Sequence, residues 1–311
     1  MKQIGQVIRG HGSHYIVKNI VKNTEVGDET YTCRLRGKFR IQRQGESNPI
    51  AVGDLVEFSL WRDEGAIEKI LPRRSKLSRL APDQRLEHVL VANLDQVAMI
   101  TSTKQPKLNF NLIDRFLMAA EYQDLRAAIC INKIDLKNDK KVQTAQRLYS
   151  ELGYSVFLTS AVTGQGIDQF KSYLAEKLTV FTGQSGVGKS SLLNKIEPGL
   201  GLRVGDICRK SRKGRHTTVC TELLPLSISG YAADTPGFRE FGLLTAHPDE
   251  IDNLLPEFRP YLMQCRFNDC RHGAEPECAV KSALLRGDIL PSRYQSYQKI
   301  FEEMKTKQKL Y

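Results

Sequence analysis

The sequence predicts a multidomain protein with an N-terminal β-barrel (residues 1–72), a central α/β domain (residues 73–245) and a mostly α-helical C-terminal domain (residues 246–311). Short alternating segments fill the first part, and buried-strand patterns that end in polar or glycine-rich motifs fill the second. A cysteine and histidine cluster marks the third. A chain of 311 residues is long enough for about two to three domains, and 41% hydrophobic residues can fill their cores.

The first domain is predicted from four segments that alternate apolar and polar residues: Gln3–Arg9, His14–Ile20, Tyr31–Ile41 and Asp54–Leu71. Glycine residues and an Asn-Pro pair separate these segments, as expected for turns between short strands. Several short strands in so small a domain favour a barrel, most simply an OB-fold.

Basic residues gather in several segments of a chain whose net charge is +11. Through Leu80 there are 15 lysine and arginine residues against 9 acidic ones, and Cys33–Arg40 alternates basic with apolar residues. We interpret Pro72–Lys76 as a basic linker, and Arg209–Arg215 is a second run. The C-terminal segment adds Lys299, Lys305, Lys307 and Lys309. Each could be an ordinary solvated surface, but basic segments in all three domains fit an extended polyanion such as RNA.

Residues 183–190 match the phosphate-binding pattern G-x-x-x-x-G-K-[ST]. The apolar stretch Leu178–Thr182 before them predicts a buried strand, and Ser191–Ile196 after them predicts the start of a helix. We expect backbone N–H groups to bind the phosphates, Lys189 to reach the β- and γ-phosphates, and Ser190 to bind Mg²⁺. The expected phosphate site comprises Gly183, Gln184, Ser185, Gly186, Val187, Gly188, Lys189, Ser190 and Ser191.

A second motif predicts which base is bound. It follows the buried-strand pattern Arg126–Ile131 and consists of Asn132, Lys133, Ile134 and Asp135. The Asp135 carboxylate can accept hydrogen bonds from the N1–H and N2 amine of guanine, a donor pair that adenine lacks. The turn Ser160-Ala161, after the strand pattern Val156–Thr159, is expected to pack on the base. Ligands of open α/β sheets bind at strand ends such as these.

A third motif, Asp-Thr-Pro-Gly at residues 234–237, completes the set. We expect Asp234 to hold Mg²⁺ through water and the Gly237 N–H to contact the γ-phosphate. The segment Gly214–Thr218 lies where the first switch of a GTPase belongs. Thr218, or else Thr217, should therefore bind Mg²⁺ in the GTP state.

The order of these motifs along the chain is unusual. In most GTPases the phosphate loop comes first and the guanine motif comes late. Here Asn132–Asp135 precedes Gly183–Ser190, and Asp234–Gly237 follows both. All the motifs are present but rotated, which predicts a circularly permuted GTPase with its switch segments directly before the C-terminal domain.

The residue after the third motif is Phe238, where many GTPases have a glutamine that orients the attacking water. A phenylalanine cannot orient water. Either basal hydrolysis is slow or another group supplies this function. His216, in the expected first switch, is the nearest candidate, although it could be an ordinary loop histidine.

A metal site is predicted after a short helical stretch at Asp249–Leu262. Its four candidate ligands are Cys265, Cys270, His272 and Cys278. Three thiols and an imidazole suit tetrahedral Zn²⁺, and a full set of four ligands indicates a structural site. A disulfide with a free thiol, or buried cysteines, would be alternatives. The other four of the seven cysteines are scattered, and no secretory signal is recognisable, which weighs against disulfides.

The arrangement of barrel, permuted motifs and Cys-Cys-His-Cys cluster resembles, over nearly the whole chain, the ribosome small-subunit-dependent GTPase A family of bacterial assembly factors. This resemblance implies GTP hydrolysis that is stimulated by the small ribosomal subunit during its late maturation, with GTP, GDP and rRNA as partners. It carries the nucleotide and zinc roles onto the motif residues named above. The family also typically lacks the glutamine, so Phe238 agrees with it.

Two other functions stay open from the residues alone. One is a GTP-gated RNA-binding module whose hydrolysis is incidental. The other is a P-loop kinase or metabolic enzyme, against which the guanine motif argues. No run of 18 apolar residues occurs, so we expect no membrane span. A cytoplasmic monomer is the expectation.

Overall fold

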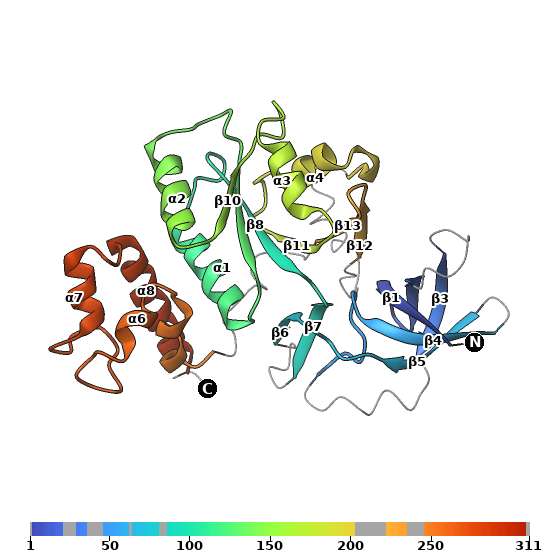
Figure 1. Ribbon diagram of the computed structural model, residues 1–311, viewed down its shortest axis with the longest axis horizontal. Helices are drawn as coiled ribbons and strands as arrows, with labels where there is room; N and C mark the ends of the chain where they lie inside the picture. Colours follow the sequence, from blue (N-terminus) through green and yellow to red (C-terminus); the bar gives the residue numbers. More distant parts are fainter. Residues whose placement is uncertain are drawn as a thin grey trace.

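The computed structural model describes residues 2–20, 29–35, 46–61, 64–80, 86–202, 222–234 and 246–308. A barrel lies at one end, a sheet flanked by helices in the middle, and a helical domain at the other end (Figure 1). Within the described residues, no helix is long and apolar enough to cross a bilayer. Several residues with expected roles lie outside the described residues: His216, Thr217, Thr218, Gly237 and Phe238. The basic run at residues 209–215 also lies outside them.

The N-terminal strands close into a barrel in the order β1-β2-β3-β5-β4, so the OB-fold expectation is confirmed. The strands are β1 (Lys2–His11), β2 (His14–Asn19), β3 (Thr30–Leu35), β4 (Leu55–Trp61) and β5 (Glu64–Ile70). The last segment predicted from the sequence thus contains two antiparallel strands. Alternate residues point inward, and the buried core includes Val7, Val17, Cys33, Val56, Phe58 and Ile67.

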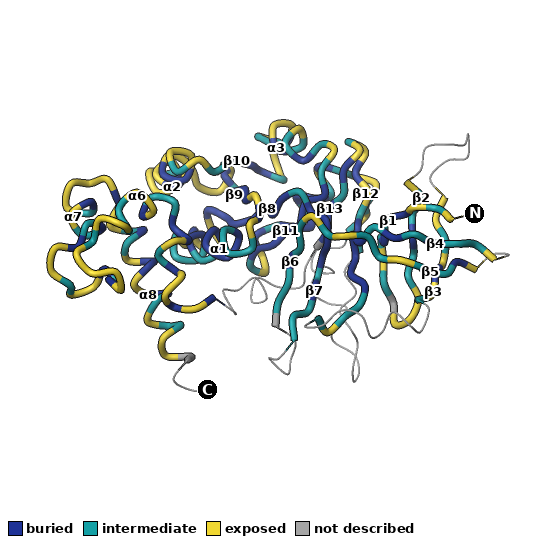
Figure 2. Tube along the Cα trace, turned by 60° about the horizontal axis from the view of Figure 1, so that its bottom comes forward, coloured by how far each residue is buried: buried dark blue, intermediate teal, exposed yellow. Residues whose placement is uncertain are grey.

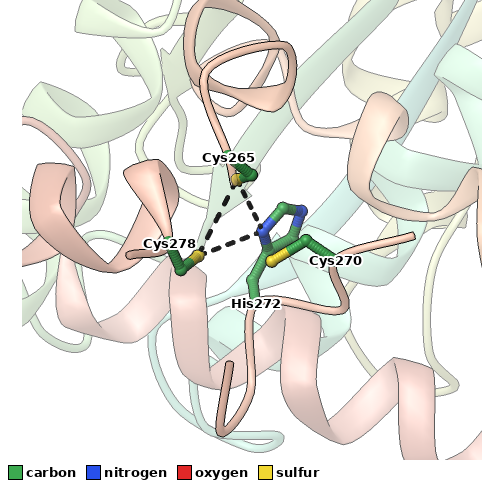
Figure 3. A group of neighbouring side chains, drawn as sticks. All are labelled: Cys265, Cys270, His272 and Cys278. Atoms are coloured by element: carbon green, nitrogen blue, oxygen red, sulfur yellow. Dashed lines mark hydrogen bonds between the residues drawn. The ribbon is translucent and has the colours of Figure 1, made fainter. Parts of the chain in front are cut away.

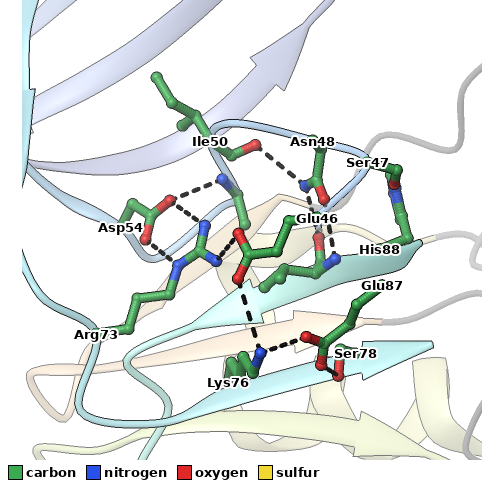
Figure 4. A network of polar contacts seen from close by, with 12 residues as sticks. Glu46, Ser47, Asn48, Ile50, Asp54, Arg73, Lys76, Ser78, Glu87 and His88 are labelled. Atoms are coloured by element: carbon green, nitrogen blue, oxygen red, sulfur yellow. Dashed lines mark hydrogen bonds and ion pairs between the residues drawn. The ribbon is translucent and has the colours of Figure 1, made fainter. Parts of the chain in front are cut away.

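The segment predicted as a basic linker follows the barrel without helix or strand up to Ser75, but its residue Arg73 is fixed in place. The Arg73 side chain is only 7% exposed. Its guanidinium donates two hydrogen bonds, of 2.7 and 2.8 Å, to the fully buried Asp54 carboxylate, and a third of 2.8 Å to Glu46 (Figure 4). Two barrel carboxylates therefore neutralise Arg73, which cannot face a polyanion. A two-stranded sheet follows, β6 (Lys76–Leu80) with β7 (Glu87–Ala92).

The other basic segments are only partly described. Arg34 on β3 is exposed but lies 3.6 Å from Glu64, and residues 36–40 lie outside the described residues. Lys299 and Lys305 are exposed. The described surface therefore retains cations on the barrel and on the last helix.

The central domain is a six-stranded sheet in the order β10-β9-β8-β11-β13-β12. All neighbours are parallel except the edge strand β12, which runs antiparallel to β13. Figure 2 shows β8, β9 and β11 of this sheet as buried strands in the middle of the molecule. Their bounds are β8 (Gln96–Ser102), β9 (Ala127–Asn132), β10 (Ser155–Leu158), β11 (Leu178–Thr182), β12 (Leu223–Leu226) and β13 (Gly230–Asp234).

Helices cover both faces of this sheet because successive strand residues point to opposite sides. Val97 and Met99 of β8 join the core beneath α1 (Phe110–Tyr122) and α2 (Lys140–Glu151). Ala98 and Ile100 join the core beneath α3 (Ile167–Leu174) and α4 (Lys189–Ile196). The side chains of Asn109 and Asp139 cap the N-termini of α1 and α2.

The C-terminal domain contains α6 (Arg259–Leu262), α7 (Ala279–Arg286) and α8 (Pro291–Gln308). The helical stretch expected at Asp249–Leu262 is broken into the 3-10 turns η4 (Pro248–Glu250) and η5 (Asp252–Leu254), followed by the one-turn helix α6. Pro256 and Pro260 lack the N–H groups that a continuous helix would need.

Helix α8 docks on α1 of the central domain through a buried ion pair. The Arg293 side chain is 1% exposed and lies 2.6 Å from the fully buried Asp114 carboxylate. Glu257 accepts a second hydrogen bond of 2.6 Å from Arg293, and the Tyr149 hydroxyl donates to Asp114 at 2.7 Å. Arg293 is thus shared by two carboxylates, and this network joins the C-terminal domain to α1 of the central domain.

Candidate functional site

The glycine-rich loop occupies the expected place between β11 and α4. Gly183 has a φ of +148°, and a Cβ there would lie 2.1 Å from the Ile100 carbonyl oxygen. Gly188 has a φ of +95°, and a Cβ there would lie 2.6 Å from Asn132 Nδ2. Glycine is therefore required at both positions, for conformation and for close approach.

The two polar residues that begin α4 are buried. Lys189 and Ser190 are each 8% exposed. Lys189 Nζ donates a hydrogen bond of 2.7 Å to the Gly183 carbonyl. Its ammonium group therefore lies against the loop that is expected to bind the phosphates. The N–H groups of the first helical turn have no partners within a helix, which makes this end of α4 suitable for phosphate.

The guanine motif is in direct contact with the glycine-rich loop, although more than 50 residues separate them in sequence. Asn132 Nδ2 donates to the Val187 carbonyl at 3.0 Å, and Asn132 Oδ1 accepts from the Ala161 N–H at 3.2 Å. One buried amide therefore joins the guanine motif, the phosphate loop and the Ser160-Ala161 turn. Ile134 supports the same turn, since its N–H donates to the Thr159 carbonyl at 3.2 Å.

Lys133 makes a second contact between the guanine motif and the glycine-rich loop. Its backbone φ is +64°, and its Nζ donates to the carbonyl oxygens of Gly186 and Gln105. Thr103 Oγ1 donates to the Lys133 carbonyl at 2.6 Å. Thr103 and Gln105 lie after β8 and carry no motif, so the sequence analysis missed their part in this site.

Asp135 is held in place by a side chain of the neighbouring turn. Ser160 Oγ donates to Asp135 Oδ1 at 2.5 Å and accepts from the Thr163 N–H at 3.1 Å. The hydroxyl group thus fixes the direction of the carboxylate. A carboxylate fixed in this way can recognise a flat base with two neighbouring N–H donors.

Asp234, the first residue of the third motif, lies at the same edge of the sheet, and residues 235–237 lie outside the described residues. In the parallel pair β11–β13, Asp234 is opposite Phe181, two residues before Gly183. Its backbone therefore lies beside the start of the glycine-rich loop. The ends of β9, β10, β11 and β13 carry all three motifs, and this is the edge where open α/β sheets bind ligands.

The four predicted metal ligands come together in the C-terminal domain (Figure 3). Their donor atoms all lie within 4.8 Å of one another. Separations are 3.9 Å for Cys265 Sγ to Cys278 Sγ, 3.7 Å for Cys265 Sγ to His272 Nδ1, and 3.3 Å for His272 Nδ1 to Cys278 Sγ. Zinc bonds of about 2.0–2.3 Å in a tetrahedron separate donors by roughly 3.3–3.8 Å. These three separations are close to that range, so the cluster could hold a metal ion.

The chemistry of the donors agrees with their spacing. Cys265, Cys270 and Cys278 are all free thiols, so the disulfide alternative is wrong. Burial raises the pKa of Cys270 to about 12 and also raises that of Cys278. A metal that binds here must displace thiol protons, which is usual for thiolate sites. His272 Nε2 lies 3.2 Å from Asp252 Oδ2, a contact the sequence analysis did not predict.

These features define a circularly permuted P-loop GTPase with a barrel before it and a metal-binding module after it. Family comparison agrees: the RsgA N-terminal domain matches residues 4–67, and the RsgA GTPase domain matches residues 70–244. The chain belongs to the RsgA GTPase family.

Relatives align over almost the whole chain. A small ribosomal subunit biogenesis GTPase RsgA from Thermotoga petrophila is 43% identical, with 91% of this chain and 92% of the relative covered. One from Flavobacterium johnsoniae is 39% identical, with 96% and 92% covered. Among solved structures, YjeQ from Thermotoga maritima superposes with a TM-score of 0.79 at 38% identity and covers 98% of this chain and 99% of that one. YloQ, described as a circularly permuted GTPase, gives 0.76 at 31% identity, with 99% and 96% covered.

Proposed function

We propose that this protein hydrolyses GTP when it is bound to the small ribosomal subunit, and that it acts as a late assembly factor of that subunit. The observation that carries the proposal is the buried Asn132 amide, which joins the guanine motif to the phosphate loop at 3.0 Å. Relatives that cover more than nine tenths of the chain are named small ribosomal subunit biogenesis GTPases. The cations on the barrel and on α8 support contact with rRNA.

In this proposal each motif has one task. Asp135 recognises guanine, and Lys133 and Asn132 hold the base pocket against the loop. The backbone of residues 183–191 binds the phosphates, and Lys189 neutralises them. Ser190 and Asp234, with Thr218 or Thr217, hold the Mg²⁺ that GTPases bring with the nucleotide, and Gly237 contacts the γ-phosphate.

The C-terminal cluster binds one structural Zn²⁺ per chain through Cys265, Cys270, His272 and Cys278. Zinc is favoured over other metals because three thiolates and one imidazole complete its tetrahedral set. The protein acts as a monomer in the cytoplasm, where the small subunit is assembled. The alternative is a GTP-gated RNA-binding module in which hydrolysis only resets the protein.

Substituting Asp135→Asn is expected to weaken GTP binding and to favour xanthine nucleotides. The exchange replaces an acceptor with a donor that faces the base, and an unpaired buried partner costs roughly 1–3 kcal/mol. Titration with fluorescent GDP and XDP measures both affinities. Glu151→Gln, on the exposed end of α2, is the matched control. Equal binding of GTP and ATP by the unchanged protein would contradict the guanine site.

Binding to the small subunit is expected to depend on the nucleotide and on salt. With a non-hydrolysable GTP analogue the protein should sediment with small subunits. With GDP, a much smaller amount of the protein should sediment with them. Rising salt should weaken binding steeply, because contacts with phosphates release counterions. Equal sedimentation with analogue and GDP would contradict a nucleotide-controlled assembly factor.

A further inference from the structure

We infer that Asp252 positions the metal ligand His272, and that this contact fixes the segment leaving the GTPase domain to the metal centre. The inference rests on the proposed zinc site. Asp252 Oδ2 lies 3.2 Å from His272 Nε2, while Nδ1 of the same ring faces the sulfur atoms of Cys265 and Cys278. The His272 side chain is 2% exposed and that of Asp252 is 19% exposed.

This geometry selects one tautomer of the imidazole. A neutral ring has a single N–H, and a carboxylate acceptor at Nε2 places the proton there. The lone pair then lies on Nδ1, which faces the sulfur atoms of Cys265 and Cys278. A carboxylate behind a ligating histidine also raises its basicity and strengthens metal binding.

Both partners are held in place. Asp252 Oδ1 accepts a hydrogen bond of 2.7 Å from the Asn253 N–H, so the carboxylate is oriented by its own 3-10 turn. The Phe258 ring stands edge-on to the imidazole with centroids 6.1 Å apart, and the Tyr297 ring lies 5.9 Å away on centroids. The imidazole therefore cannot turn to bring another atom to the metal without disturbing this packing.

An ion pair at the neighbouring residues joins the same two segments. Arg271, the residue before His272, lies 2.5 Å from Asp249 through its guanidinium. The carboxylates of Asp249 and Asp252 thus contact two consecutive residues, Arg271 and His272, in the loop that carries the predicted metal ligands. Ile251, between them, is fully buried. Zinc binding and the order of residues 246–255 must then be linked, and such linkage is reciprocal.

The test measures metal affinity rather than GTPase activity. In the full-length protein, Asp252→Ala is expected to bind Zn²⁺ about 10–100-fold more weakly in competition with a chromophoric chelator. Asp252→Asn should be intermediate, because its amide oxygen can accept from Nε2–H but carries no charge. Asp168→Asn, exposed in the first turn of α3, is the matched control and should stay close to the wild-type protein, since it lies in the central domain and touches neither His272 nor its neighbours.

Two further measurements separate positioning from folding. Co²⁺ loaded in place of Zn²⁺ should show an altered visible spectrum in Asp252→Asn, although its helical circular dichroism is kept. Metal loading should slow the hydrogen exchange of residues 246–255 in the wild-type protein. The same loading should slow it much less in Asp252→Asn. Unaltered metal affinity in both Asp252 variants would overturn the inference. If the wild-type protein bound no zinc, the proposed zinc site would be overturned, and this inference with it.

Discussion

Removing the metal, by chelation or by Cys270→Ala, is expected to unfold the C-terminal domain while the GTPase domain still binds guanine nucleotide. Structural zinc supplies about 10–16 kcal/mol of apparent binding energy in small zinc modules. Between α6 and α7 the chain has no helix or strand from residue 263 to residue 278, and a metal bound to the four candidate ligands would cross-link this segment. The contacts between guanine motif and phosphate loop are made within residues 103–189 and should survive.

Metal analysis should find about one zinc per chain, as four ligands around one tetrahedral site require. Helical circular dichroism should fall on chelation, and fluorescent GDP binding should persist. Cys33→Ala is the matched control, because it removes a buried thiol from the barrel core and should leave the zinc content unchanged. A metal-free protein with an intact C-terminal domain would contradict a structural role for zinc.

Replacing His216 by alanine is expected to remove most of the hydrolysis rate that small subunits add. Phe238 cannot orient water, and we expect His216 to supply this function when the subunit is bound, since a positioned acid or base contributes typically about 10²–10⁴-fold. Single-turnover hydrolysis at saturating GTP and saturating subunits measures this step directly.

A catalytic role predicts that the affinity of the His216→Ala variant for GTP, and its sedimentation with subunits, are kept while the rate falls. His14→Ala, on the barrel, is the control for loss of a histidine elsewhere in the chain. If the stimulated rate of His216→Ala equals that of the unchanged protein, His216 is not the catalytic group.

The fold could be predicted from sequence where local patterns decide it. Strands β9 and β11 are continuous apolar runs that end in motifs, and their bounds follow from the residues. The antiparallel edge strand β12 was not predicted, because a four-residue strand that contains Pro225 has no strand pattern, and proline is tolerated only at an edge. The fixed position of Arg73 was missed because its partners Asp54 and Glu46 lie 19 and 27 residues away in sequence.

The candidate site also contains residues that the sequence could predict and residues that it could not. Glycine, lysine and cysteine spacing identified the loop, the guanine motif and the metal cluster, because that chemistry needs those residue types. The supporting residues Thr103, Gln105 and Asp252 have no such signature. A hydroxyl group, a backbone carbonyl and a carboxylate perform their roles, and only the tertiary fold brings them to Lys133 and His272.

GTP turnover with and without small ribosomal subunits tests the proposed function most directly. Isolated protein should turn over slowly, and subunits should raise the rate strongly, since a partner that completes such a site is worth about 10³–10⁵ in rate. High salt should abolish the gain, because rRNA phosphate contacts are lost. A GTP-gated binding module would bind subunits without faster turnover, and a kinase would need a small-molecule acceptor. If isolated protein hydrolyses GTP as fast as the mixture does, the subunit-dependent GTPase proposed here is contradicted.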